Sequence, residues 1–247
     1  MDSLRKTALI TGVLYLVTFV TSIPALILYG PVLNDSHYIL GPGADTRIFV
    51  AAFLEVLLAI AGIGTAVTIF PVVRRQNEGV ALGFVAARVV EAAIIAVGII
   101  SLLAVVSMRR DLAGSGTDPA TLVVAGKTLV AIHKWTFLIG PAFCSGIESG
   151  LMLGYLMYRS GLVPRPIAVL GLAGGTLAFA AATMELFEVF PQVSGTALIL
   201  TLPEALFEAV LGTWLTFKGF LPSPVTAAIT RPAENAAARN GRPPVMP

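Results

Sequence analysis

Two ionisable residues, Arg88 and Glu91, lie in the stretch GFVAARVVEAAIIAVG, which covers residues 83–98. This stretch belongs to an apolar run from Val80 to Val106 that is long enough, as a helix, to cross the hydrocarbon core of a bilayer. Residues three apart share one face of a helix, so the two side chains can form an ion pair. Because charges at that depth need partners and often mark an ion, proton or ligand pathway, residues 83–98 predict a polar intramembrane site.

Seven carboxylates fall within the apolar segments and extend this site: Glu55, Glu91, Glu148, Glu185, Glu188, Glu204 and Glu208. If all were ionised, desolvation in a low dielectric would oppose the excess negative charge, so we expect them to hold protons, bind a cation or contact water. Such groups would titrate as a coupled set, as in a proton relay or a cation site. The candidate site residues are therefore Glu55, Arg88, Glu91, Glu148, Glu204 and Glu208.

Alternative roles exist for several of these residues. Arg88 and Glu91 can instead hold two helices in register without touching a ligand. Glu185 and Glu188 lie near a helix end, where we expect them to reach the membrane interface. Glu204 follows Pro203, and a proline inside a span frees a backbone carbonyl and can kink the helix around a cavity, which favours a functional role.

Composition places the chain among membrane proteins. Hydrophobic residues make up 56% of the 247 residues and charged residues 12%, about half the share that is usual in soluble domains. The net charge of +2 is dispersed over loops and termini, which gives no footprint for nucleic acid. The single cysteine, Cys144, excludes an intrachain disulfide.

The apolar runs predict an all-α bundle of six transmembrane helices at residues 7–29, 46–70, 79–107, 135–158, 167–190 and 195–217. Asp118 followed by Pro119 is a helix-start signal, and we expect a short interfacial helix at 119–132. One straight helix from Pro119 to Tyr158 would be about 60 Å long, about twice the hydrocarbon thickness. We therefore expect a break near His133 and Lys134, with His133 at the interface, and a disordered Pro/Ala-rich tail at 221–247.

Lysine and arginine are more frequent on the side of the bundle that holds the termini, which predicts that both termini are cytoplasmic in a bacterial plasma (inner) membrane. Arg109 and Arg110 do not follow this rule, because they fall on the outer side. With this topology the carboxylates would form a polar cavity, lined by the second, third, fifth and sixth helices and open to the outer side. Arg88 would be its fixed cation.

Glycines at helical spacing predict close helix packing. Gly146, Gly150 and Gly154 recur every four residues in the fourth helix, with Glu148 roughly opposite, and Gly171 and Gly175 repeat the pattern in the fifth. Small residues at this spacing let helix backbones approach closely. The first three are a candidate contact for an oligomer.

Several segments together resemble a bacterial membrane family known as domain of unknown function 4386: RKTALITGVLYLVTF from Arg5, FLEVLLAIAG from Phe53, GFVAARVVEAA from Gly83, KWTFLIGPAF from Lys134 and LMYRSGLVPRPIAVLGLAGG from Leu156. The resemblance covers the chain from Arg5 to about Phe220. It implies an integral membrane protein with no known activity, and it supplies no catalytic residue or cofactor. The positions of Glu55, Arg88 and Glu91 resemble the polar positions of the family pattern.

Three functions fit these observations. The first is a transporter that couples a small molecule to protons or cations, as deep carboxylates favour. The second is an intramembrane enzyme that modifies a lipid, although no His or Asp cluster with metal-ligand spacing supports a metal hydrolase. The third is an assembly or sensor partner of another membrane protein.

Overall fold

The computed structural model describes residues 3–41, 43–112 and 116–227, which form helices and no strand. As predicted, six of the helices are long and apolar enough to cross a membrane. The described elements outside the fourth span are α1 (Ser3–Leu28), α2 (Gly30–Asn34), a 3-10 turn (Tyr38–Leu40), α3 (Asp45–Val73), α4 (Glu78–Asp111), α7 (Arg165–Leu186) and α8 (Gly195–Phe217).

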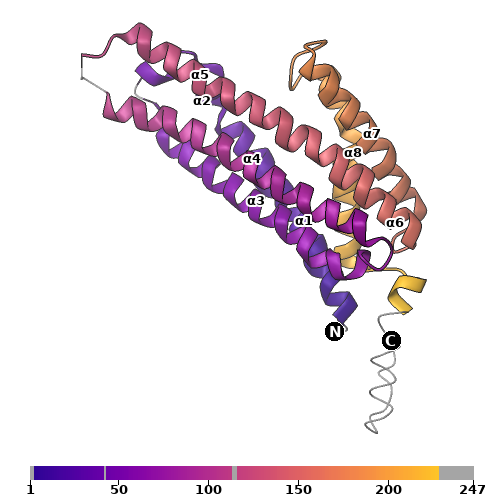
Figure 1. Cartoon of the computed structure of the whole chain (residues 1–247). Helices are drawn as coiled ribbons and strands as arrows, with labels where there is room; N and C mark the ends of the chain where they lie inside the picture. Colours follow the sequence, from indigo (N-terminus) through magenta and orange to yellow (C-terminus); the bar gives the residue numbers. More distant parts are fainter. Residues whose placement is uncertain (1–2, 42, 113–115, 228–247) are drawn as a thin grey trace.

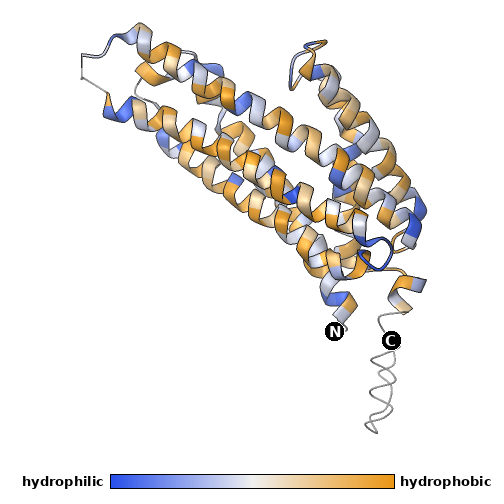
Figure 2. Ribbon diagram, in the orientation of Figure 1, coloured by the Kyte–Doolittle hydropathy of each residue, from blue (hydrophilic) through white to orange (hydrophobic). Residues whose placement is uncertain are grey.

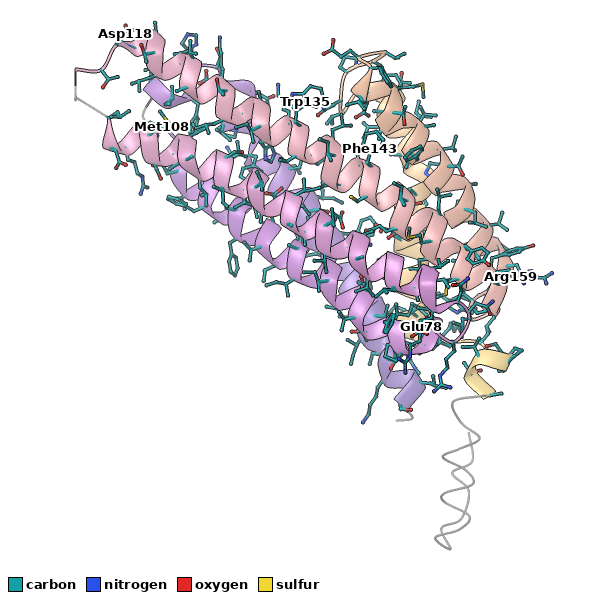
Figure 3. All side chains as sticks on the ribbon, in the orientation of Figure 1. Glu78, Met108, Asp118, Trp135, Phe143 and Arg159 are labelled. Carbon is teal, nitrogen blue, oxygen red and sulfur yellow. The ribbon has the colours of Figure 1, made fainter. Side chains whose placement is uncertain are left out.

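The fourth span is a continuous helix of 42 residues, Pro119–Ser160, so the expected break and the separate interfacial helix are wrong. It consists of α5 (Pro119–Phe137), two π-helical segments (Leu138–Cys144 and Gly146–Leu153) and α6 (Gly154–Ser160). We call it the long helix. Figure 3 labels Asp118 beside its first turn and Arg159 near its last. The predicted start is confirmed, because the Asp118 carboxylate accepts a hydrogen bond of 3.1 Å from the Thr121 amide.

The expected break fails because His133 is buried inside the protein. Its side chain is 5% exposed, its ring lies edge-on to that of Tyr29 at 5.4 Å, and Nδ1 is 3.4 Å from the Gly98 carbonyl oxygen. Neighbouring helices thus cover the imidazole, so it does not need to lie at the membrane–water interface. The length of the helix does not prevent it from spanning a bilayer, because a tilted helix can be longer than the hydrocarbon is thick. Figure 1 shows that the long helix runs obliquely to α7 and α8.

The first π-helical segment contains a proline. Pro141 lies within Leu138–Cys144, and proline has no N–H to donate to the helix ladder. Wide π turns inside α-helices occur frequently at functional sites. The second π-helical segment carries Glu148.

The helices pack in two groups that meet along the long helix (Figure 1). α1, α3 and α4 lie side by side, and the N-terminal part of the long helix packs on α4. α7 and α8 form a hairpin, in which α7 packs on the second π-helical segment and α8 on α1. The start of α1 therefore lies near the end of α8, where Arg5 donates a hydrogen bond of 2.7 Å to the Thr216 carbonyl oxygen.

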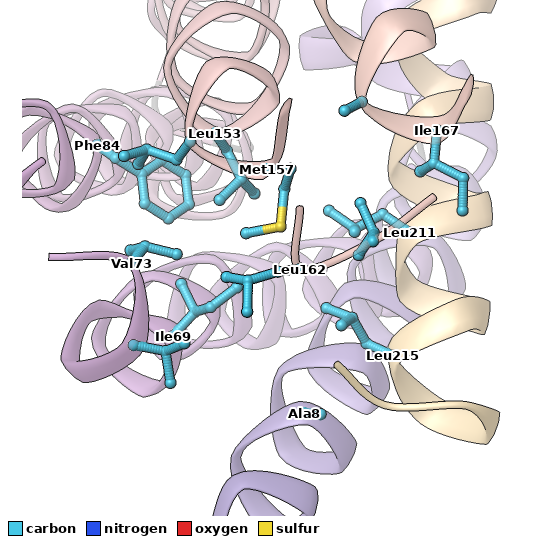
Figure 4. Packing of buried hydrophobic residues seen from close by; sticks show 14 of the residues in the cluster. Ala8, Ile69, Val73, Phe84, Leu153, Met157, Leu162, Ile167, Leu211 and Leu215 are labelled. Carbon is cyan, nitrogen blue, oxygen red and sulfur yellow. The ribbon is translucent and has the colours of Figure 1, made fainter. Parts of the chain in front are cut away.

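An apolar core fills this shared end of the bundle. Figure 4 shows its packing, in which Phe84 of α4, Leu153 of the long helix and Leu211 of α8 approach one another with Ile69 and Leu162. The outer surface is apolar as well, and polar residues gather mainly toward the helix ends (Figure 2). Phe53, Ile60 and Ile100, for example, are 61%, 61% and 65% exposed, as expected of side chains that face lipid.

The opposite end contains the two arginines that break the charge rule. Both pair with Asp45 at the start of α3: Arg110 Nε lies 2.8 Å from its carboxylate, and Arg109 contacts the same oxygen. Arg109 also donates to the Gly41 carbonyl oxygen at 2.9 Å. Burial, together with the Asp45 carboxylate, raises the pKa of the Tyr38 phenol. The loop before α3 is thus tied to α4 by a paired cluster.

The segment after α8 is ordered at its start, although we expected disorder from Leu221 onward. The Leu221 amide donates a hydrogen bond of 2.8 Å to the Leu162 carbonyl oxygen, and Val225 is buried. The rest of the expected tail, residues 228–247, lies outside the described residues.

Candidate functional site

Arg88 of α4 is the centre of a buried charge cluster. Its side chain is 6% exposed and donates hydrogen bonds to Glu91 (2.9 Å), Glu208 (2.9 Å) and the Ser149 hydroxyl (2.6 Å). Its Nε also lies 2.8 Å from a carboxylate oxygen of Glu148. We call Arg88, Glu91, Glu148 and Glu208 the Arg88 cluster. The structure thus brings four of the six predicted site residues into direct contact.

Four helices supply the groups around the guanidinium. Glu91 and Arg88 come from α4, Glu148 and Ser149 from the long helix, and Glu208 from α8. Tyr15 of α1 places its ring 5.6 Å from the guanidinium carbon, a cation–π distance.

The set of helices differs from the one that we expected. Among the described residues, the hydrogen bonds, ion pairs and ring contact of the guanidinium involve α1 and the long helix but not α7. The second transmembrane helix, α3, lies close through Gly62, where a β-carbon would be 3.8 Å from the guanidinium. Arg88 and Glu91 lie inside the bundle, because they are 5% and 8% exposed.

The Arg88 cluster carries more acid than base. One guanidinium faces three carboxylates, of which the Glu148 side chain is wholly buried and that of Glu208 is 16% exposed. Full ionisation would leave two excess negative charges in a low dielectric, which desolvation opposes. The arrangement can therefore bind protons, and its charge balance depends on how many it holds.

Glu204 lies one helical turn before Glu208 on α8 and is 3% exposed. Within the described residues, neither of its carboxylate oxygens has a hydrogen-bond partner. It faces Gly150 of the long helix, where a β-carbon would be only 2.6 Å from Oε2. Glycine at position 150 thus makes room for a buried carboxylate that lacks a partner.

A pocket of about 320 Å³ opens between the long helix and α8 and reaches both Glu204 and Glu208. Its walls are apolar, with Phe137 and Pro141 on one side and Leu198 and Leu202 on the other. A second pocket of about 780 Å³ adjoins it beneath the connection between α7 and α8. The two share Leu26, Phe137, Glu185 and Val193. We call the two adjoining pockets together the acidic groove, because four carboxylates line them; one of these is Glu208 of the Arg88 cluster.

The other predicted carboxylates lie apart from the Arg88 cluster. Glu55 accepts a hydrogen bond of 2.9 Å from the Tyr29 hydroxyl, and within the described part of the chain the hydrogen bonds and ion pairs of Arg88 involve neither residue. Glu188 is exposed at the end of α7, as expected of an interfacial residue. Glu185 is only 8% exposed and lines the acidic groove, so it has a buried position that we did not expect.

Sequence analysis missed Tyr15 and Ser149. The Tyr15 hydroxyl lies 3.4 Å from that of Ser149, so the two complete the polar surroundings of Arg88. A signal for Tyr15 was available, because Thr11 and Thr18 lie four residues before and three after it and give α1 one polar face. Both threonines are buried.

The glycines of the long helix pack within the chain. Gly146 and Gly150 contact α7 at Gly175, and a β-carbon on Gly175 would be 2.6 Å from the α-carbon of Gly150. Gly154 approaches the backbone of α7 at Gly171 and Leu172. The proposed oligomer contact through these glycines is therefore covered by α7 of the same chain.

Comparison with known families matches residues 10–219 to the family described as "Domain of unknown function (DUF4386)". Comparisons with curated proteins and with solved structures give no match. The matched range contains Arg88, its three carboxylate partners, Glu204 and all six spans apart from the first residues of α1. The chain is therefore a multi-pass integral membrane protein that belongs to the DUF4386 family.

Proposed function

We propose that the protein is a proton-coupled transporter of a small molecule, in which the Arg88 cluster and Glu204 form a site that protons and substrate share. The observation that carries this proposal is the buried Glu204 carboxylate. It has no hydrogen-bond partner among the described residues, and it lines a pocket of about 320 Å³. A buried polar group without a partner is costly, and an ionisable one inside a membrane bundle is the kind of group that a ligand or a proton completes.

Charge balance links protons to substrate at this site. The Arg88 cluster places three carboxylates around one guanidinium, and the buried Glu204 adds a fourth one helical turn from Glu208. Protons neutralise the excess while the pocket is empty, and a bound substrate that changes the local charge changes the number of protons held. Arg88 supplies a constant positive charge, because guanidinium does not lose its proton in proteins.

The way in which the two pockets reach the site supports transport. The acidic groove reaches Glu204 and Glu208 from the end of the bundle that carries the connection between α7 and α8. Toward the opposite end of the bundle, buried apolar residues lie about one helical turn from the site: Phe84 four residues before Arg88, Leu153 four residues after Ser149 and Leu211 three residues after Glu208 (Figure 4). A site open to one side and sealed on the other is one of the two states that alternating access requires.

Proton movement in proteoliposomes tests the proposal. Vesicles that contain the purified protein and the pH-sensitive dye pyranine are exposed in turn to cationic, neutral and anionic small molecules. We expect at least one class to move protons with wild type, and Arg88→Leu and Glu91→Gln to abolish the signal. The matched control is Glu78→Gln, at the first turn of α4 and away from the site.

Two outcomes of this experiment would contradict the proposal. If no class of molecule moves protons, or if both Arg88→Leu and Glu91→Gln transport like wild type, the cluster only holds the helices together. Size-exclusion profiles of each variant show whether a loss of signal reflects loss of folded protein.

A further inference from the structure

We infer that the ligand of this site is an amphiphilic organic cation that enters from the membrane through the acidic groove and places its charged group beside Glu204. The inference rests on the proposed function, because it names the class of molecule that the proton-coupled site would carry. It follows from the charge of the groove, from its apolar walls and from its opening.

The charge of the acidic groove selects the sign of the ligand. Four carboxylates line it, those of Glu185, Glu188, Glu204 and Glu208, against one ammonium group, that of Lys134. An anionic headgroup would meet repulsion at Glu204, which no donor among the described residues offsets. A cation instead supplies the partner that Glu204 lacks, and ion pairing is strong in a site from which water is excluded.

The walls of the acidic groove select an amphiphile over a small hydrated ion. Phe137, Pro141, Leu198 and Leu202 surround the carboxylates in the pocket of about 320 Å³. Pockets of roughly 300–1,000 Å³ with mostly apolar walls and a few convergent polar groups suit organic ligands. A bare metal ion would need several oxygen ligands, and the described residues contain no group of three or more His, Cys, Asp or Glu placed to hold one.

The opening of the groove faces the bilayer. Leu198 and Leu202 line the pocket, yet they are 57% and 54% exposed. They lie in the first half of the membrane-spanning helix α8, and exposed leucines in such a helix face lipid. An amphiphile dissolved in the bilayer can therefore pass between α8 and the long helix without crossing an aqueous route.

Equilibrium binding of tetraphenylphosphonium to the purified full chain in detergent tests this inference, and tetraphenylborate is an anion of the same shape. We expect saturable binding of the phosphonium cation and at least about tenfold weaker binding of the borate. Glu204→Gln should weaken phosphonium binding at least about tenfold. Glu78→Gln should bind like wild type.

A second variant tests whether the ligand occupies the pocket, independently of the charge of Glu204. Ala142→Phe adds a ring to the wall of the pocket without changing any charge, and it should also lower phosphonium affinity. Equal binding of cation and anion, or full phosphonium affinity in both Glu204→Gln and Ala142→Phe, would overturn the inference. Phosphonium binding without proton release would contradict only the proposed coupling, whereas proton transport driven by another class of molecule would contradict only the ligand class.

Discussion

The guanidinium of Arg88 serves three carboxylates and one hydroxyl at once. Arginine suits this position because its planar fork presents five donors in fixed directions, which a lysine ammonium cannot reproduce. The pairing also explains why Glu148 tolerates complete burial. Removing the guanidinium would leave buried carboxylates without a cation.

Arg88→Leu should therefore destabilise the folded protein by about 3–5 kcal/mol, the usual cost of breaking a buried ion pair from one side. Thermal unfolding in detergent measures the loss. Adding Glu148→Gln to Arg88→Leu should recover part of it, since the second change removes a carboxylate that has lost its partner. No recovery in the double variant would show that Glu148 does not depend on Arg88.

The two arginines at the end of α4 allow a matched comparison. The Arg109 side chain is 11% exposed and also binds the Gly41 carbonyl oxygen, whereas that of Arg110 is 54% exposed. Arg109→Gln should cost about 1–3 kcal/mol, and Arg110→Gln less than about 1 kcal/mol, because exposed ion pairs are weak. Unfolding midpoints of the two variants check the order, and a larger loss for Arg110→Gln would contradict it.

At the scale of elements, glycine lets the long helix meet α7. Gly150→Ala would push a methyl group into Gly175 and the Glu204 carboxylate, so we expect a loss of about 1–3 kcal/mol from overpacking. Gly195→Ala is the control, because nothing lies within 4 Å of a β-carbon there. Thermal unfolding of both variants in detergent measures this loss. Equal stability would mean that the two helices are not in contact at this point.

Sequence patterns predicted six apolar spans, although some ends differ: α3 continues through Pro71 to Val73, and α7 ends at Leu186 and not at residue 190. They failed in the long helix, because His133 and Lys134 look like a boundary in sequence while Tyr29 and Gly98 cover His133 in space. The burial of a polar group by a distant helix cannot be inferred from local spacing.

The candidate site was predictable only where its residues lie on the same helix. Arg88 and Glu91 share a helix face, so their pairing follows from spacing alone. The approach of Glu148 and Glu208 depends on how the long helix and α8 pack, and spacing cannot give that. Ser149 was overlooked because a serine beside a glutamate has no distinctive pattern until Arg88 is placed against it.

At the scale of the whole molecule, the orientation in the membrane is still a prediction from lysine and arginine. A variant without Cys144 can carry single cysteines at Ser36, in the loop before α3, or at Arg75, in the turn before α4. In intact cells, a membrane-impermeant maleimide should label the cysteine of Ser36→Cys and spare that of Arg75→Cys, because the termini are predicted to be cytoplasmic. The reverse pattern would invert the topology.

Proton release on ligand binding tests most directly whether the buried carboxylates exchange protons for a cation. Purified protein in weakly buffered solution is mixed with tetraphenylphosphonium while a pH indicator records the change. Wild type should release about one proton for each cation bound, because the ligand replaces a proton in neutralising the site. Glu204→Gln should release almost none. Saturable binding with no proton release by wild type at any pH would contradict the exchange.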